Sequence, residues 1–399
     1  MLHHKTHIKL AAFIVAALLV SLALFSIAFT ESDAGPAYHI TNPYADVEWE
    51  TYGQYKANLH THSNISDGDH PLSEMVEAYY AKGYHVLAMT DHNHLSTRWD
   101  EAKKGAVSSE RTAEILAGAG RGGAPMVGVD HTNEHSSANH INTFWHPNSH
   151  GGNTISSIIE QAESYGGVSH INHPGRYTGG SDQNDSASIA AAKKPKTIKK
   201  YVDLFTQYPS CVGMEIVNRL DNDSKSDRIL WDSILTELTP GGRPVWGFAG
   251  DDAHRLVDIG YAWNVLLMPS NNQADIRKAI ETGAFYAVSR VSRLDGVNRK
   301  RPDGKGISAT ATNATLYLLE QPTPEITNIV VGGDAIRIDG LRYDTIEWIA
   351  DGAVIATGNE LVLTDYAEQI NGYVRAQLKS QTGIAFTQPF MIRTVSEEE

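Results

Sequence analysis

Two histidines separated by one residue, His60 and His62, form the stretch with the clearest chemical potential. Side chains two positions apart on a strand point to the same side, so both imidazoles can reach one metal ion. Asp67 follows in a predicted turn and can supply an oxygen ligand to a neighbouring metal. Asp252 and His254 repeat the two-residue spacing much later in the chain. The repeated pattern indicates a metal site rather than a chance pair of surface histidines.

Further candidate ligands lie between these two pairs. They are His92, Glu134, His140 and His173. A hydrolytic metal cluster needs several nitrogen and oxygen ligands for each ion, together with a bridging carboxylate or hydroxide. The chain therefore carries the residue types for such a cluster.

Composition limits the class of partner. The chain has 399 residues, 18 histidines and a formal net charge of −14. This charge argues against long nucleic acid, whose binding surfaces are normally basic. It leaves a small phosphorylated substrate open, because bound cations would dominate the local field. The single cysteine, Cys211, lies in an apolar run and is expected to be a small buried hydrophobe.

Residues 10–30 form a mostly apolar stretch without charge, which is long enough to span a bilayer as a helix. Lys5 and Lys9 precede it and predict an N-terminus on the inside. We expect residues 1–31 to be a signal anchor, with a cleaved signal peptide as the alternative. Either reading places the protein on the cell membrane facing outside, or in secreted form. Residues 32–45 read as a linker.

The next part, 46–295, alternates predicted helices with apolar strands that end in loops rich in candidate ligands. The predicted helices include 71–82, 155–165, 226–238 and 274–282. Loops that follow parallel strands meet at one face of a closed barrel, so an α/β barrel is expected, with an open doubly wound sheet as the alternative. Residues 182–200 read as an exposed insertion. Residues 284–288 read as the strand of one more such unit.

The composition changes after a basic, glycine-containing boundary at 290–306. Short apolar segments with turn signals between them then predict a small all-β, sandwich-like domain over 305–396. The predicted strands are 315–319, 326–331, 335–338, 345–350, 360–363, 374–378 and 390–393.

The order of the motifs resembles the PHP (polymerase and histidinol phosphatase) family. The matching motifs are His60-x-His62 with Ser66-Asp67-Gly68, Thr90-Asp91-His92, Asn133-Glu134 with His140-Ile141-Asn142, His173-Pro174-Gly175, and Asp252-x-His254. They cover roughly residues 55 to 290. The resemblance implies a distorted (β/α)7 barrel that holds two or three divalent metal ions at the carboxyl ends of its strands, and a phosphoesterase activity. Mixed histidine and carboxylate ligation suits Zn, Mn or Fe.

The resemblance also implies roles for single residues. The first metal would be held by His60, His62 and Asp252. The second would be held by His140 and His173, and Glu134 would bridge the first and second. The third would be held by Asp67, His92 and His254. A hydroxide between the metals would be the nucleophile.

Catalytic roles are expected for Glu134, Asp252 and Arg176, the last as a bidentate grip on phosphate. Arg219 is a weaker candidate for the same grip. Asp130 in place of Glu134, and His170 in place of His173, remain alternatives. Asp91, Asp251 and Glu215 are expected to support the ligands, the first two by orienting imidazoles.

We therefore expect an exported metal-dependent hydrolase of a phosphate mono- or diester. Hydrolysis of an amide or cyclic ester by the same cluster is the alternative. A third reading is a surface-binding protein with a structural metal, in which the β-domain recognises polysaccharide or a partner. A membrane contact is expected only through an uncleaved N-terminal helix, and no oligomeric state is predicted.

Overall fold

The computed structural model describes residues 38–97, 99–101, 104–136, 139–148, 153–178, 186–219, 224–290 and 321–395. The predicted signal anchor and the predicted strand 315–319 lie outside these residues. Within the described ranges, no helix combines the length and the apolar character needed to cross a membrane.

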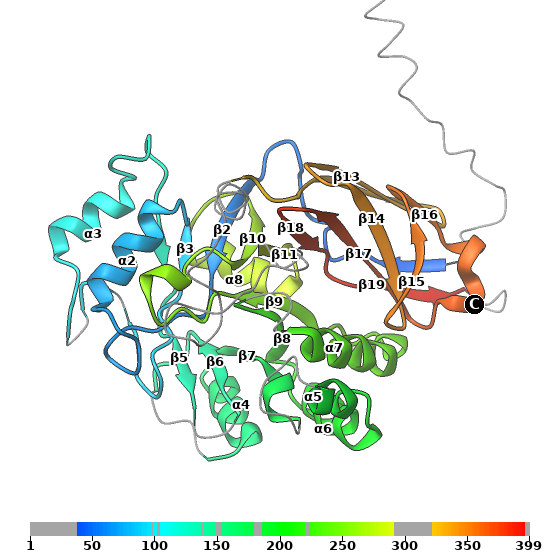
Figure 1. Cartoon of the computed structure of the whole chain (residues 1–399), viewed down its shortest axis with the longest axis horizontal. Coiled ribbons are helices and arrows are strands. Elements are labelled where there is room, and N and C mark those ends of the chain that lie inside the picture. Colours follow the sequence, from blue (N-terminus) through cyan, green and yellow to red (C-terminus); the bar gives the residue numbers. More distant parts are fainter. Residues whose placement is uncertain are drawn as a thin grey trace, which may run out of the picture.

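Strands and helices alternate through the first part of the described chain (Figure 1). The strands are β2 (Gly53–Asn58), β3 (Val86–Leu87), β4 (Val127–Gly128), β5 (Asn133–His135), β6 (Ile141–Phe144), β7 (Val168–Ile171), β8 (Cys211–Asn218), β9 (Trp246–Gly250), β10 (Ala262–Met268) and β11 (Phe285–Arg290). The helices are α2 (Leu72–Ala81), α3 (Ser109–Leu116), α4 (Ile155–Ser164), α5 (Ser186–Ala191), α6 (Pro195–Gln207), α7 (Lys225–Leu238) and α8 (Gln273–Thr282). Short 3-10 turns are η1 (Pro174–Tyr177), η3 (Thr239–Gly241) and η4 (Leu256–Asp258).

Local sequence signals explain these helices. In α2 the buried side chains are Leu72, Met75, Val76, Tyr79 and Tyr80, which is the spacing of one helix face. Helix α4 begins after a reciprocal capping box between Thr154 and Ser157. Helix α8 ends at Gly283, whose φ of 77° suits the left-handed cap that glycine adopts without strain. The predicted ranges of these helices agree with the structure to within about two residues.

The strands of this part belong to two sheets, which are connected beside the candidate site. Strands β2, β3 and β4 pair in parallel, as do β7, β8 and β9. Strands β5, β6 and β7 pair antiparallel. An isolated bridge between Thr61 and Ala253 links the segments that follow β2 and β9. The protein is therefore mixed α/β as expected, while the closure and strand count of a (β/α)7 barrel stay predictions.

The prediction that 284–288 continues a series of parallel units is wrong. Strand β11 runs antiparallel to β10, and β10 runs antiparallel to β2. The strand β10, whose apolar run Ala262–Met268 was not predicted, lies between them. Strand β11 then pairs on its other side with a strand of the C-terminal region.

The C-terminal region is all-β, as predicted, with strands β12 (Glu325–Gly332), β13 (Ala335–Leu341), β14 (Thr345–Ala350), β15 (Ala353–Thr357), β16 (Glu360–Val362), β17 (Tyr373–Ser380), β18 (Gly383–Phe386) and β19 (Phe390–Thr394), and the turn η5 (Leu363–Gln369). It occupies the end of the molecule opposite α2 and α3 (Figure 1). Strand β18 pairs with β11, so β17, β18 and β19 share one sheet with β10 and β2. Strands β12, β13 and β16 form a separate three-stranded sheet.

One hydrophobic core joins the two parts. Trp263 and Tyr286 of the first part belong to the same buried cluster as Trp348 and Leu378 of the C-terminal region. The side chain of Gln388 also forms two hydrogen bonds with the backbone of Gly247 in β9, of 2.7 and 3.0 Å. The C-terminal strands therefore complete the fold of the first part by covering its apolar sheet surface.

Two stretches differ from their predicted structure. Residues 38–41, placed in the predicted linker, form the strand β1 (Tyr38–Thr41), which pairs antiparallel with β19. The predicted exposed insertion 182–200 is mostly exposed over its described residues 186–200, but it contains α5 and the start of α6, and Ser188, Ala191 and Ala192 are buried. In both cases a distant element provides the covering surface, which local composition does not reveal.

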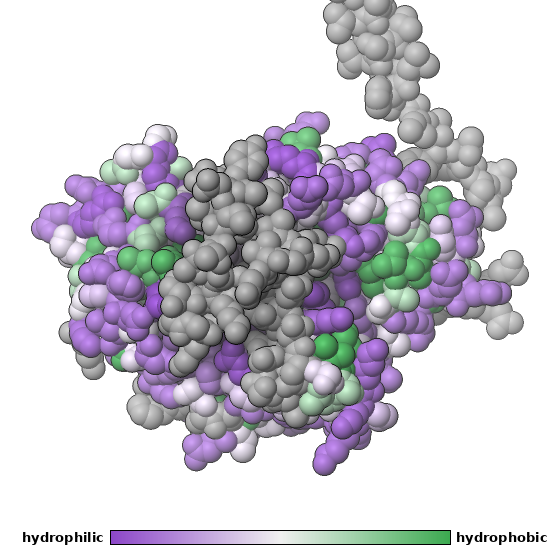
Figure 2. All heavy atoms as spheres, viewed as in Figure 1, coloured by the Kyte–Doolittle hydropathy of each residue, from purple (hydrophilic) through white to green (hydrophobic). Residues whose placement is uncertain are grey.

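Hydrophilic side chains predominate on the face shown in Figure 2, and hydrophobic ones form small separate patches there. Among the described residues, the large apolar side chains that are exposed belong to different elements: Leu116, Tyr165, Val257, Leu341, Val354 and Val395. Single exposed apolar residues are usual on soluble domains.

Candidate metal centre

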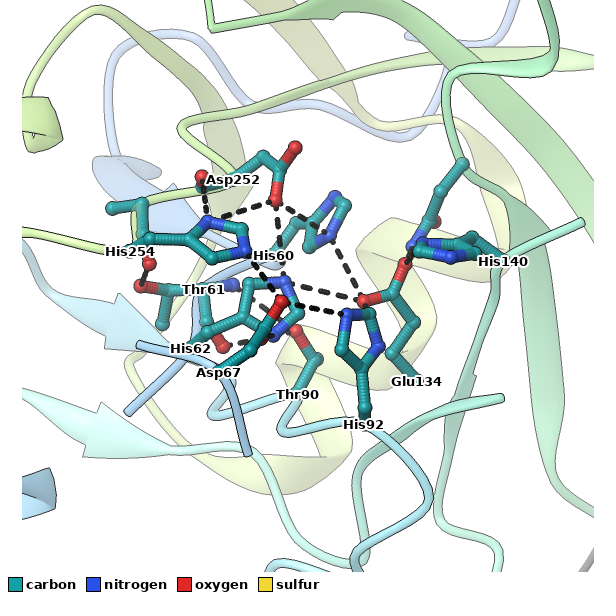
Figure 3. Close-up of polar contacts among 12 residues, drawn as sticks. His60, Thr61, His62, Asp67, Thr90, His92, Glu134, His140, Asp252 and His254 are labelled. Atoms are coloured by element: carbon teal, nitrogen blue, oxygen red, sulfur yellow. Dashed lines mark hydrogen bonds and ion pairs between the residues drawn. The ribbon is translucent and has the colours of Figure 1, made fainter. Parts of the chain in front are cut away.

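The structure brings the nine predicted ligands into one cluster, and Figure 3 labels all of them except His173. They follow the strand ends, as expected for β2, β3, β7 and β9, while Glu134 lies within β5 and His140 directly precedes β6. The bridge between Thr61 and Ala253 sets the His60–His62 segment beside the Asp252–His254 segment. Both pairs with two-residue spacing therefore face the same point.

Four donor atoms form a compact first set. Nε2 of His60 lies 3.4 Å from both Glu134 Oε2 and Asp252 Oδ1. Nε2 of His62 lies 3.2 Å from the same two oxygens. A tetrahedral ion with bonds of about 2.0–2.1 Å needs about 3.3–3.4 Å between its ligand atoms. These distances match that requirement.

The two carboxylate oxygens of Glu134 face different histidines. Oε2 lies 3.0 Å from Nδ1 of His92, in addition to its contacts with the first set. Oε1 lies 2.8 Å from Nδ1 of His140 and 3.9 Å from Nε2 of His173. This division suits a carboxylate that bridges two ions.

A third set surrounds Asp67 at the more exposed side of the cluster. Its Oδ2 lies 3.2 Å from Nε2 of His254 and 3.5 Å from Nε2 of His92. Nδ1 of His62 lies 3.7 Å from the other oxygen of Asp67. The ring of His92 thus faces Glu134 with one nitrogen and Asp67 with the other.

Several of these atoms are buried polar groups that cations would satisfy. Within the described residues, Nε2 of His60, both ring nitrogens of His62, Nδ1 of His92 and Oε2 of Glu134 are buried without a hydrogen-bond partner. An unsatisfied buried polar group costs about 1–3 kcal/mol. Nitrogen and oxygen donors without partners, gathered at ligand spacing, fit divalent metal ions well.

The backbone is strained at three candidate ligands. His140, His173 and Asp252 have φ values of 38°, 25° and 43°, which side chains other than glycine rarely adopt. Such strain persists only where surrounding contacts hold it, and it concentrates at functional sites. Near His173, one such contact comes from Asp227, which the sequence analysis did not identify. Its Oδ1 accepts a 2.6 Å hydrogen bond from the backbone N–H of Gly175.

Charge in the cluster shifts its pKa values. Burial raises the pKa of Glu134, but His60, His140 and His92 outweigh burial and hold it well below its usual range. Burial likewise raises the pKa of Asp252, but Arg219 and His60 outweigh burial and hold this pKa well below its usual range. Both carboxylates are therefore ionised and ready to bind cations at neutral pH.

We expect metal affinity to rise with pH. Burial lowers the pKa of His92, but its ion-pair contacts with the carboxylates of Asp67 and Glu134 outweigh burial and raise that pKa to about 10. In the metal-free protein, the stabilisation from charged His92 is complete below about pH 6.5 and is lost as pH rises through about 10. A metal must displace this proton, so affinity should increase by up to about tenfold per pH unit for each proton released.

Mn²⁺ titrations by calorimetry in buffers of different ionisation enthalpy would measure the released protons directly. An affinity that does not change across the neutral to alkaline range would contradict the expected competition between protons and metal.

Two expected supporting roles are wrong in detail. Asp91 accepts hydrogen bonds from the backbone and hydroxyl groups of Ser63 and Ser66, so it holds the loop rather than an imidazole. Asp251 accepts from the hydroxyl of Tyr84 and from backbone N–H groups at 260–262. Both aspartates shape the backbone beside the ligands because the nearest donors there are main-chain and hydroxyl groups.

Neither of the two alternative ligands belongs to the groups of possible ligands found among the described residues. Asp130 belongs to none of the groups of possible ligands among the described residues, whereas Glu134 belongs to two. His170 stacks on Phe248 with ring centroids 4.6 Å apart, and burial lowers its pKa to about 3. The geometry thus favours Glu134 and His173.

The two arginines contact Asp252 to different extents, while their ranking as phosphate-binding groups stays a prediction. Nε of Arg219 donates a 3.1 Å hydrogen bond to Asp252 Oδ2, while the guanidinium of Arg176 lies 3.9 Å from that oxygen. Sequence reasoning also missed Asn172, whose Nδ2 donates a 2.8 Å hydrogen bond to Oε1 of Glu134. A polar residue at the end of a buried strand, next to His173, was the available signal.

One family model matches the first part of the chain. Residues 58–165 match the PHP domain. This match spans roughly a quarter of the chain and includes six of the nine candidate ligands, from His60 to His140. The other three follow the matched range.

One curated relative is the DNA polymerase/3'-5' exonuclease PolX of Bacillus subtilis (strain 168), which is 47% identical over 51 residues. The aligned segment covers 12% of this chain and 9% of that relative. The shared region is thus a small part of the PolX protein.

Three solved structures are similar at low sequence identity. A two-domain protein from Bacteroides vulgatus, containing a predicted PHP-like metal-dependent phosphoesterase, is 13% identical, with 92% of each chain covered and a TM-score of 0.44. An amidohydrolase from Chromobacterium violaceum is 15% identical, covering 50% of this chain and 87% of its own, with a TM-score of 0.32. A lesion-specific endonuclease from Pyrococcus furiosus is 14% identical, covering 57% and 56%, with a TM-score of 0.33.

Proposed function

We propose that this protein is a metal-dependent phosphoesterase that hydrolyses a small phosphate mono- or diester. The observation that carries the proposal is the two-sided position of Glu134. One oxygen faces the compact set formed with His60, His62 and Asp252, and the other faces His140 and His173. The match of residues 58–165 to the PHP domain supports the same reading.

Divalent cations bound here would polarise phosphoryl oxygens and lower the pKa of a water nucleophile. The protein's own groups prepare the site for them. Arg219 binds Oδ2 of Asp252, which leaves Oδ1 directed at the histidines. Asn172 and the neighbouring imidazoles hold Glu134 in place.

Positive charge at the edge of the cluster supports an anionic substrate. The guanidinium groups of Arg176 and Arg219 both approach Asp252 and are partly exposed, at 31% and 26%. Guanidinium groups recognise phosphate oxygens by paired hydrogen bonds. A purely structural metal site would not require such charges, or a carboxylate shared between two ligand sets.

The test uses the full chain loaded with Mn²⁺ or Zn²⁺. Elemental analysis would count the bound metals, and the same preparation would be assayed on chromogenic phosphate monoesters and diesters. Bound metals with turnover support the proposal and identify the ester class. Bound metals without turnover on either ester, but with hydrolysis of an amide or cyclic ester, would overturn it.

Arg219→Ala is expected to lower turnover of the preferred ester by about 100-fold, the scale seen for a single charge-stabilising donor. Arg219→Lys should restore little of the lost turnover, because an ammonium group cannot reproduce the paired hydrogen bonds of a guanidinium group. Steady-state kinetics would measure both variants. Arg393→Ala, at an exposed position of β19, is the matched control. Wild-type kinetics in Arg219→Ala would remove this residue from the proposed site.

A further inference from the structure

Glu215 in β8 is a buried carboxylate that contacts two of the candidate ligands. Its Oε1 lies 2.7 Å from Nδ1 of His60. Its Oε2 accepts hydrogen bonds from the backbone N–H of His173, at 2.9 Å, and from Nδ2 of Asn218, at 3.0 Å. Both oxygens are therefore engaged, each on a different side.

The nitrogen that Glu215 contacts distinguishes its role from that of a ligand in the first set. The first set uses Nε2 of His60, which lies 3.4 Å from Glu134 Oε2 and Asp252 Oδ1. Glu215 contacts the other ring nitrogen, Nδ1, at 2.7 Å, which matches a charge-assisted hydrogen bond.

The neighbouring strand is built around this contact. A Cβ atom at Gly250, the last residue of β9, would lie 2.5 Å from Oε1 of Glu215 and 2.8 Å from Cβ of His60. Contacts this close are not tolerated between real atoms, so a side chain at this position would push the pair apart. The absence of a side chain at Gly250 is therefore what allows Glu215 to reach His60.

The other oxygen supports a strained part of the backbone. His173 has a φ of 25°, and its N–H is held by Oε2 of Glu215. The next loop residues are held by Asp227 through Gly175. Release of the His173 N–H would let this turn relax and move the imidazole.

We propose that Glu215 is a positioning residue that orients the ligands of two metal positions at once, His60 by its side chain and His173 by its backbone. The proposal rests on the metal centre of the proposed function, but not on the reaction catalysed there. By accepting from Nδ1–H, Glu215 holds the tautomer of His60 that presents Nε2 to Glu134 and Asp252.

Glu215→Gln removes one of the two acceptors, because an amide has a single oxygen. Whichever way it is oriented, its NH2 group would face either His60 Nδ1–H or the donors of His173 and Asn218. Glu215→Asp keeps the charge but withdraws the carboxylate by about 1.5 Å, the length of one carbon–carbon bond. If only the negative charge of Glu215 mattered, Glu215→Asp would keep normal metal affinity. If Glu215 positions the two ligands, Glu215→Asp would lose affinity as well.

We expect both variants to lower Mn²⁺ affinity by about 10–100-fold, the usual effect of losing a group that orients a metal ligand. Calorimetric titration and metal counts would measure this loss. The unfolding midpoint of each metal-free variant would show whether the fold is retained. Glu110→Gln, which removes an exposed carboxylate from α3, is the matched control.

Affinity equal to that of the control in either variant would overturn the proposal. A second measurement needs no variant. In the zinc-loaded native protein, NMR of labelled histidine should show a far-downfield, slowly exchanging Nδ1 proton on His60. Its absence would overturn the proposal even if the variants failed to fold. Normal metal binding without phosphoester turnover would instead contradict only the proposed function.

Discussion

Glu134→Gln is expected to abolish phosphoester turnover and to lower metal affinity by more than about 100-fold, beyond the loss typical of groups that only support a ligand. The glutamine keeps the shape of the side chain but loses its charge and one of its two acceptor oxygens. Glu134 is buried and faces His60, His62, His92, His140 and His173. Its loss would disturb the ligand sets on both sides of the cluster, and it would also remove the contact to His92, which faces Asp67 with its other nitrogen.

Elemental analysis and steady-state kinetics on the same preparation would measure these effects. Asp130→Asn is the matched control, since Asp130 was the alternative bridge in the sequence and lies outside the described ligand groups. Turnover retained in Glu134→Gln and lost in Asp130→Asn would reverse the assignment.

Arg375→Ala is expected to lower the free energy of unfolding by about 3–5 kcal/mol, as when one partner of a buried ion pair is removed. Nε and a terminal nitrogen of Arg375 in β17 donate to both oxygens of Asp232 in α7, at 2.7 and 2.8 Å. The hydroxyl of Tyr373 donates to the same carboxylate at 3.0 Å. The truncation would leave the charge of Asp232 buried at the junction of the two parts.

Urea unfolding followed by circular dichroism would measure the change. The comparison requires that the free energy of unfolding falls with urea concentration at the same slope in the native protein and the variant. Lys199→Ala removes one partner of the exposed pair with Asp203 and should cost less than about 1 kcal/mol. Metal affinity should stay unchanged in Arg375→Ala, because the pair lies outside the cluster. A loss no larger than in the control would show that the ion pair between Arg375 and Asp232 does not contribute to the docking of the C-terminal strands.

Local periodicity was sufficient for much of the fold and for the types of ligand. The two-residue spacing in His60–His62 and Asp252–His254 predicts that each pair faces one side, and each pair does so although both lie just past the ends of β2 and β9. The apolar face of α2 and the glycine after α8 set helix ranges in the same local way. Most C-terminal strands could be predicted because alternation and turn residues are local signals too.

Only the tertiary structure decided which distant groups meet. Glu215 is 155 residues from His60, and Arg375 is 143 residues from Asp232. The pairing of β18 with β11 and of β1 with β19 likewise depends on which apolar surfaces need covering. Contacts of this kind arise when the whole chain packs, so the sequence determined the candidate ligands, while packing decided their partners and their orientation.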